Sequence, residues 1–179
     1  EFRRVLFRSA TLIKNAKRPL IIAGAGVLKS GAMDELKELA EKAQIPVTNT
    51  LVGLGGFPGN HELALGMVGM HGSVAANNST EEADLVIAAG IRFHDRITGH
   101  PDFFCKKAKI IHIDIDPAEI DKNVTINVPI VGDLKRVLSE LNTLVEPTTH
   151  EAWIGQIREW QAEYPMVIPE SKDGVLHPQ

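Results

Sequence analysis

The chain has 179 residues and a formal net charge of −4 with its seven histidines counted as neutral. This length is enough for one hydrophobic core of roughly 100–150 residues and some additional segments. The lack of net positive charge and the 5% aromatic content argue against nucleic acid as a partner. No apolar run approaches the roughly 20 residues of a membrane span, and a single cysteine, Cys105, excludes an internal disulfide.

The two ends of the chain differ from the part between them. Residues 1–10, EFRRVLFRSA, begin with Glu-Phe, which a restriction site can encode, and they join no later pattern. We expect them to be a cloning or assembly remnant outside the fold. The other end, ESKDGVLHPQ, is polar and contains no predicted element. From both ends we expect the chain to be a piece of a longer polypeptide.

Between these ends, apolar runs typical of strands alternate with helical patterns. In chain order the sequence predicts a strand over 18–26, a helix over 30–44, a short strand over 45–51, a weaker helix over 72–83, strands over 83–91, 108–116 and 126–133, and an amphipathic helix over 134–145. The runs 83–91 and 108–116 are rich in β-branched residues, which is typical of strands buried on both faces of a parallel sheet. Pro129 places the strand 126–133 near an edge.

Strands that alternate with helices imply right-handed βαβ units and an open, doubly wound, mainly parallel sheet. The predicted α/β domain covers residues 11–148. Sheets of this class bind ligands outside the carboxyl ends of their strands. Four conspicuous patches fall at those ends: Gly24–Gly26, Thr50–Gly53, Gly90–Arg92 and Asp114–Asp116.

Two of these patches have a structural explanation beside a functional one. Gly24 and Gly26 would let a backbone approach a diphosphate, or would only make a tight turn from strand to helix. Lys29 stands where a dinucleotide-binding fingerprint would have its third glycine. Asp114 is suited to ribose hydroxyls, although it lies far from Gly24 for the usual fingerprint. Asp116, directly before a proline, fits a helix N-cap.

The segment MVGMHGS, Met67 to Ser73, places two methionines and a histidine between glycines. A lone histidine beside apolar residues is more often packed than reactive, and a methionine pair is ordinarily part of a core. A flexible apolar wall would also suit a flat aromatic ring. The remaining histidines are too scattered for a helical zinc pair, so we expect no metal site made by this chain alone.

The segment RFHDRITGH follows the predicted strand that ends at Gly90. Guanidinium groups suit phosphate because their planar donors bind two oxygens at once, so Arg92 and Arg96 are candidates for an anion site. Asp95 would pair with either arginine and hold it in place. The alternative is a solvated surface loop with weak mutual ion pairs.

Taken together, the ordered motifs GAG, NTLVGLGGFPGNHELALGMVGMHGS, ADLVIAAGIRFHDRITG, KIIHIDIDPAEIDKN and VPIVGD resemble the central domain of acetolactate synthase, the large catalytic subunit of a thiamine-diphosphate-dependent enzyme. The resemblance covers about residues 11–148 and implies a Rossmann-like domain. Residues 149–179 resemble the linker toward the family's third, diphosphate-binding domain. Central domains of glyoxylate carboligase, pyruvate oxidase and oxalyl-CoA decarboxylase, or a nucleotide-binding module without catalysis, are the alternatives.

The resemblance implies that this domain binds FAD in a structural role, without net redox change. The implied FAD contacts are Gly24, Gly26, Thr50, Leu51, Val68, Gly69, Met70, His71, Gly90, Ile91, Arg92, Asp114, Ile115, Asp133 and Leu134. Of these, Asp133 and Leu134 would lie by the adenine. Met67, Asp95 and Arg96 match positions that face the substrate channel. The family usually has Asp where this chain has His94, so the resemblance assigns His94 no role.

For the complete enzyme, the resemblance implies decarboxylation of pyruvate on thiamine diphosphate, held by Mg²⁺, and transfer of the two-carbon unit to a second 2-oxoacid in branched-chain amino acid biosynthesis. It also implies a cytoplasmic enzyme of bacterial type, with an organellar location left open. The partners would be other copies in a homodimer or homotetramer, and a small regulatory subunit. The family's thiamine-activating glutamate and its Gly-Asp-Gly…Asn motif do not occur in these residues. We therefore expect no catalytic residue here and no activity from this chain alone.

Overall fold

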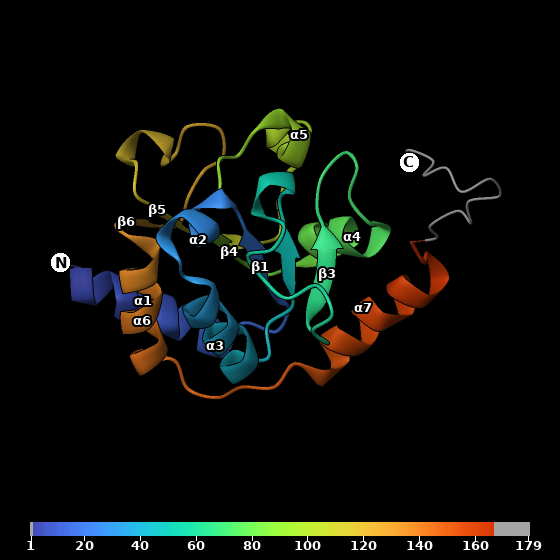
Figure 1. Ribbon diagram of the computed structural model, residues 1–179, viewed down its shortest axis with the longest axis horizontal. Coiled ribbons are helices and arrows are strands. Elements are labelled where there is room, and N and C mark those ends of the chain that lie inside the picture. Colours follow the sequence, from blue (N-terminus) through green and yellow to red (C-terminus); the bar gives the residue numbers. More distant parts are fainter. Residues whose placement is uncertain (1, 167–179) are drawn as a thin grey trace.

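The computed structural model describes residues 2–166 (Figure 1). Six parallel strands form one sheet in the order β3-β2-β1-β4-β5-β6. The strands are β1 (Pro19–Ala23), β2 (Val47–Asn49), β3 (Ala64–Met67), β4 (Leu85–Ala89), β5 (Lys109–Asp114) and β6 (Val128–Val131). The helices are α1 (Phe2–Asn15), α2 (Ala25–Ser30), α3 (Met33–Ala43), α4 (Val74–Glu82), α5 (Asp95–Thr98), α6 (Leu134–Leu144) and α7 (Glu151–Glu163), with 3₁₀ turns η1 (Leu51–Gly53), η2 (Pro101–Phe103) and η3 (Pro117–Glu119).

The strand order confirms the predicted doubly wound α/β fold. The chain starts in the middle of the sheet at β1, builds outward to β3, and then returns to the other side of β1 to add β4, β5 and β6. The direction of winding therefore reverses between β1 and β4, which is the place where such sheets open a crevice for ligands. β6, which contains Pro129, lies at the edge of the sheet, as predicted.

Each face of the sheet has its own hydrophobic core. Alternate residues of the central strands enter opposite cores, since side chains of a strand point to its two faces in turn. Ile21 and Ile87 join the core that α1, α3 and α6 cover, whereas Ile22 and Val86 join the core under α4 and α7. This burial on both faces explains why β4 and β5 are continuous β-branched runs.

The edge strand β3 is absent from the sequence prediction. It has only four residues, pairs with β2 through an irregular register, and contains Gly66 with a φ of +77°. A strand this short, with one glycine inside it and another soon after it, shows no alternation that a sequence pattern can detect. It matters because it ends at the segment Met67–Ser73.

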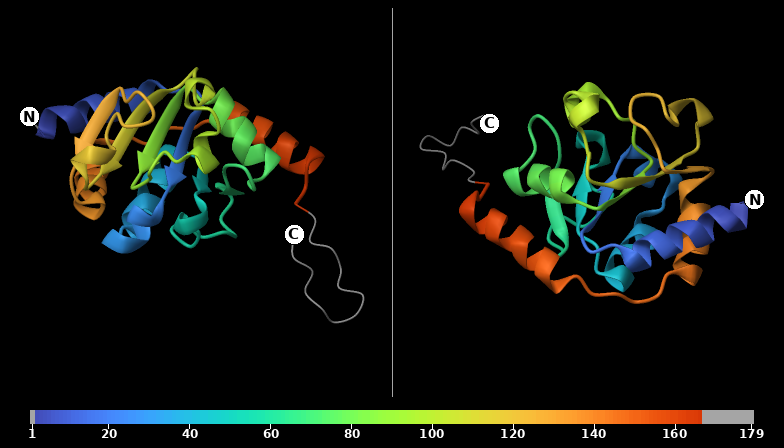
Figure 2. Two further views of the ribbon diagram at one scale, coloured as in Figure 1. Left: turned by 90° about the horizontal axis from the view of Figure 1, so that it is seen from above. Right: turned by 180° about the vertical axis from the view of Figure 1, so that it is seen from behind.

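The packed body extends beyond both predicted domain boundaries. Residues 2–10, which we left out of the fold, form the first part of α1, where Leu6 and Ser9 are buried. At the other end, α7 lies beside α4 in Figure 1 and in both views of Figure 2, with Trp153 and Ile157 buried. The indole Nε1 of Trp153 donates a hydrogen bond to the carbonyl of Pro19 at 3.0 Å. The origin of residues 1–10 and the linker role of residues 149–179 stay predictions.

No helix in the part of the chain that the structure describes is both long and apolar enough to cross a membrane.

The loops that follow β1 and β4 touch backbone to backbone. The amide of Gly26 donates to the carbonyl of Gly90 at 3.0 Å, and a Cβ on Gly26 would lie 2.6 Å from the Cα of Gly90. A Cβ on Gly24 would lie closer still to the carbonyl oxygen of Gly90, and Gly90 itself has a φ of +60°. The GAG motif is therefore required for packing between neighbouring loops, which supports the tight-turn explanation of these glycines.

We expect Gly26→Ala to destabilise the fold by roughly 1–3 kcal/mol, because backbone atoms would have to move to admit the methyl group. Gly155→Ala is the matched control. Gly155 lies inside α7 with nothing within 4 Å of its would-be Cβ, so alanine should stabilise the helix by roughly 0.5–1 kcal/mol. Urea denaturation of both variants measures the two changes. Equal stability of the Gly26→Ala variant and the wild type would contradict the packing argument.

Candidate functional site

The four predicted patches meet at one edge of the sheet. The first residue of three patches donates a backbone hydrogen bond to the residue just before a neighbouring patch. The amide of Gly24 donates to Ala89 at 2.9 Å, that of Thr50 to Ala23 at 2.9 Å, and that of Gly90 to Ile113 at 2.8 Å. Parallel strands place their carboxyl ends side by side, so the loops that follow them form one surface. This confirms that the patches share an edge, and two hollows open along it.

The first hollow, which we call the β5–β6 hollow, has a volume of about 150 Å³. Its lining contains six of the predicted FAD contacts: Gly26, Gly90, Asp114, Ile115, Asp133 and Leu134. Lys29 and Ser30, at the end of α2, also line it. In the sequence, Lys29 is conspicuous only because it stands in place of a glycine. Within the described residues its ammonium group makes no salt bridge, so a positive charge is available here.

Both carboxylates of the β5–β6 hollow already accept backbone hydrogen bonds. Asp114 Oδ1 accepts from the amide of Asp116 at 2.9 Å, and Asp133 Oδ1 caps α6 by accepting from Arg136 at 3.0 Å. Asp116 in turn accepts from Ala118 at 2.9 Å at the start of η3, which confirms its predicted cap. Each carboxylate of the hollow keeps its second oxygen for another donor, such as a hydroxyl group.

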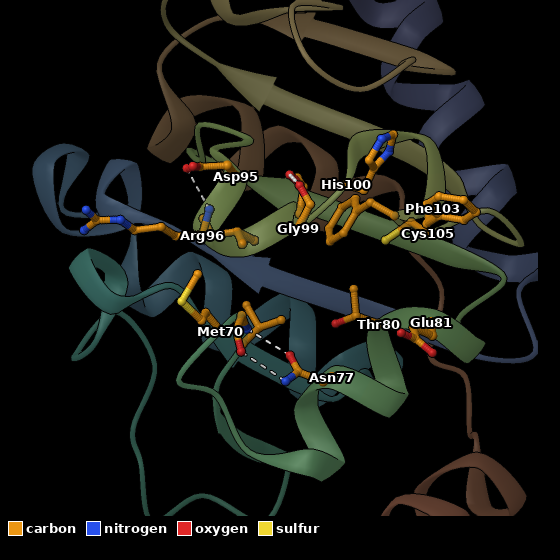
Figure 3. Close-up of a pocket in the computed structure, with 15 residues that line it drawn as sticks. Met70, Asn77, Thr80, Glu81, Asp95, Arg96, Gly99, His100, Phe103 and Cys105 are labelled. Atoms are coloured by element: carbon orange, nitrogen blue, oxygen red, sulfur yellow. Dashed lines mark hydrogen bonds between the residues drawn. The ribbon is translucent and has the colours of Figure 1, made fainter. Parts of the chain in front are cut away.

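The second hollow, the α4–α5 cavity, has a volume of about 480 Å³ and is shown in Figure 3. It brings together Val68, Gly69 and Met70, predicted to contact FAD, with Asp95 and Arg96, predicted to face the substrate channel. Met67 lies outside its lining, half-buried at the end of β3. The lining residues that sequence reasoning missed are Asn77, Thr80, Glu81, Ile97, Thr98, Gly99, His100, Phe103, Phe104 and Cys105.

Of the two alternatives for Met70 and His71, the packed one does not hold. Met70 is 73% exposed, and His71 is exposed too. Their backbone is fixed all the same, because the amide of Met70 donates to the carbonyl of Arg96 at 3.0 Å. The segment therefore presents two side chains outward from a tied backbone, which is typical of a binding loop.

The predicted pairing of Asp95 with an arginine is also wrong. Asp95 Oδ1 accepts from the backbone amide of Arg96 at 2.9 Å, and within residues 2–166 it makes no ion pair with a guanidinium group. Arg92 instead faces Glu119, with 3.7 Å between Nε and Oε1, and Lys122 reaches the same oxygen at 3.1 Å. Glu119 is much farther from Arg92 along the chain than Asp95 is. Sequence spacing alone therefore could not identify this pair.

A buried histidine fixes the backbone just before Arg92. His112 Nε2 lies 2.9 Å from the carbonyl oxygen of Ile91, and its ring packs edge-on against Phe93 with 5.0 Å between centroids. Burial lowers the pKa of His112, against the hydrogen bond to Ile91 and the nearby Asp114, which raise it. The neutral ring then donates from Nε2, which leaves Nδ1 buried without a partner in the described structure. In the sequence, His112 is only one of several scattered histidines, so no motif marks this role.

Three of the predicted FAD contacts have side chains that the described structure leaves unpaired or uncovered. The hydroxyl of Thr50 is buried and has no hydrogen-bond partner in the described structure. Leu51 and Ile115, at the ends of β2 and β5, are 66% and 71% exposed. An unpaired buried hydroxyl and exposed apolar side chains along the same edge favour a surface that a ligand or another protein segment covers. No group of three or more His, Cys, Asp or Glu side chains in residues 2–166 is arranged to hold a metal ion.

An open parallel sheet whose carboxyl edge carries two hollows defines a ligand-binding domain of the doubly wound α/β class. A sequence model of the family described as "Thiamine pyrophosphate enzyme, central domain" matches residues 6–141. The chain belongs to this family, whose name gives thiamine diphosphate by its older term.

Curated relatives agree with this assignment. The chain is 54% identical over 155 residues, 85% of its length, to the "Probable acetolactate synthase large subunit" of Methanocaldococcus jannaschii. It is 44% identical over 173 residues, 94% of its length, to the acetolactate synthase large subunit of Parasynechococcus marenigrum. It is 44% identical over 185 residues, 98% of its length, to the acetolactate synthase of Mycobacterium avium. The chain spans 26%, 28% and 29% of the lengths of these three relatives.

We expect the fold to lose stability as the pH falls below about 6.5. His112 has a pKa below its usual 6.5 in the folded state, so below pH 6.5 the unfolded chain binds more protons than the folded chain. His150, whose pKa burial also lowers, acts in the same direction. Each such histidine contributes a slope of up to about 1.4 kcal/mol per pH unit until its folded pKa is reached.

Denaturation at a series of pH values measures this slope. His112→Gln keeps a donor for the Ile91 carbonyl but does not titrate, so the slope should become shallower, with the contribution of His150 remaining. An unchanged slope in this variant would show that His112 is not the titrating group.

Proposed function

We propose that this chain is the central domain of an acetolactate synthase large subunit and that its carboxyl edge binds FAD. The observation that carries the proposal is that predicted contact residues from distant parts of the sequence come together in the fold. Residues that the family resemblance selects from distant parts of the sequence line two hollows at one edge, and the buried hydroxyl of Thr50 at that edge lacks a partner. The relatives named acetolactate synthase support the choice of enzyme within the family.

The residues at the edge fit the chemistry of FAD. Lys29 offers a positive charge to a diphosphate, and Asp114 has a carboxylate oxygen for a ribose hydroxyl. Leu51 and Met70 offer exposed apolar surface to a flat ring. In such an enzyme FAD supplies no net redox chemistry, so the task of these residues is to bind it, orient it and exclude water around it.

In the complete enzyme we propose that pyruvate and a second 2-oxoacid are the substrates, and that thiamine diphosphate and Mg²⁺ are held by segments other than these residues. Arg96 and Asp95, in the α4–α5 cavity, would face the substrate channel, with Met67 beside them. Homodimers or homotetramers and a small regulatory subunit are the proposed partners.

The first test is binding and activity of the 179-residue chain. We expect it to quench flavin fluorescence saturably when titrated into FAD, and to form no acetolactate from pyruvate with thiamine diphosphate, Mg²⁺ and FAD. The second result follows because the chain lacks the family's thiamine-activating glutamate and its diphosphate motif. The matching full-length enzyme is the positive control. Acetolactate formed by this chain alone would overturn the assignment of catalysis to other segments.

The two arginines of RFHDRITGH should have separable roles. Arg92 reaches Glu119 and stays outside the lining of the α4–α5 cavity, whereas Arg96 lines it. In the full-length enzyme, Arg92→Ala should weaken FAD binding by about 1–3 kcal/mol if a charge-assisted hydrogen bond is lost, and excess FAD should restore part of the activity. Arg96→Ala should leave FAD affinity nearly unchanged and alter the response to substrate.

Flavin fluorescence titration of both apo variants, followed by assays at saturating FAD, measures this division. Equal losses of FAD affinity would show that the segment acts as one anion clamp instead.

A further inference from the structure

The strongest unassigned feature is a side chain that grips the backbone of the predicted binding loop. Asn77, in the second turn of α4, makes two hydrogen bonds to one residue, as Figure 3 shows. Its Oδ1 accepts from the amide of Gly69 at 2.9 Å, and its Nδ2 donates to the carbonyl of Gly69 at 3.0 Å. One amide group thus satisfies both backbone polar groups of a single glycine.

The gripped glycine also joins two loops. Gly69 has a φ of +106°, and a Cβ there would collide with the carbonyl oxygen of Arg96. The next amide, that of Met70, donates to the same carbonyl oxygen at 3.0 Å. Asn77 therefore holds the glycine at which a close backbone contact joins the segment 67–73 to the segment 94–99. The first segment carries predicted FAD contacts, and the second carries predicted substrate-channel residues.

Backbone hydrogen bonds also hold the segment 67–73: the amide of Met70 donates to Arg96 at 3.0 Å, and that of Gly72 donates to the carbonyl of Gly69 at 2.8 Å. The amide of Ser73 donates to Met67 at 2.9 Å, and the Ser73 hydroxyl donates to Leu65 at 3.0 Å. Among the described residues, Asn77 is the only one whose side chain bonds the stretch from Gly69 to His71. Met70 and His71 project outward from this stretch, so their direction depends on a backbone that Asn77 and these backbone bonds hold together.

We propose that Asn77 is a positioning residue. It holds the segment 67–73, which carries predicted FAD contacts, in place against the segment 94–99, which carries predicted substrate-channel residues. The proposal rests on the proposed function. Asparagine suits the task because its short amide offers one donor and one acceptor; aspartate offers acceptors only, and its charge would repel the Gly69 carbonyl. The purely structural alternative is that Asn77 only stabilises the start of α4.

Asn78 provides a matched control. It is the same residue type on the same helix, is half-buried like Asn77, and makes no side-chain hydrogen bond within residues 2–166. Asn77→Asp and Asn77→Ala are therefore compared with Asn78→Asp and Asn78→Ala in the full-length protein. The aspartate variants preserve side-chain shape, so they keep the test valid if an alanine variant fails to fold.

The first readout is hydrogen–deuterium exchange in the protein without FAD. Loss of the two hydrogen bonds should speed exchange roughly tenfold in the segment 67–73. Exchange should also speed up in the segment 94–99, while the rest of α4 keeps its protection. The Asn78 variants should match the wild type in both segments. Unchanged exchange in both segments of the Asn77 variants, or faster exchange confined to α4, would overturn the proposal.

The second readout is function, with FAD affinity and steady-state kinetics measured separately. The Asn77 variants should bind FAD roughly tenfold more weakly, and at saturating FAD they should still show a raised KM with a smaller change in kcat. A purely structural role predicts that both losses in the Asn77 variants only follow their loss of thermal stability, and that result would overturn the proposal. If the wild-type enzyme does not bind FAD, the proposed function fails, and the exchange result still decides whether Asn77 couples the two loops.

Discussion

The close approach of the loops after β1 and β4 is the constraint on which the rest of the carboxyl edge depends. The amides of Gly24 and Gly26 donate to Ala89 and Gly90, so two backbones run together without side chains between them. This contact fixes where α2 begins and where the segment after Gly90 departs. Because Gly26 and Gly90 also line the β5–β6 hollow, the packing of the sheet and the shape of that hollow depend on the same atoms.

The loops of the edge are held mainly by backbone contacts, which leaves their side chains available. The amide of Val68 donates to Asn49 and that of Met70 to Arg96, yet the side chains of Met70 and Arg96 are exposed. In such an arrangement the backbone path of a loop does not depend on which side chains it exposes. Substitutions at these exposed positions of the α4–α5 cavity should therefore leave the fold intact.

Much of the fold could be predicted from the sequence because its strongest signals are local. The runs 83–91 and 108–116, the edge strand with Pro129 and the cap at Asp116 all depend on neighbouring residues, and the structure bears them out. The short strand β3 and the packing of α1 and α7 depend on partners far along the chain. The family resemblance selected residues of both hollows, although no pattern could pair Arg92 with Glu119 or Asn77 with Gly69, because those contacts arise only after folding.

Both tryptophans of the chain lie in α7. Trp153 is buried against the sheet and packs edge-on against Trp160, with 5.8 Å between ring centroids and an angle of 86°. Intrinsic tryptophan emission from this domain therefore originates at the seam between α7 and the sheet. It reports whether the last helix is docked, and comparison with far-ultraviolet circular dichroism shows whether that helix detaches before the sheet melts.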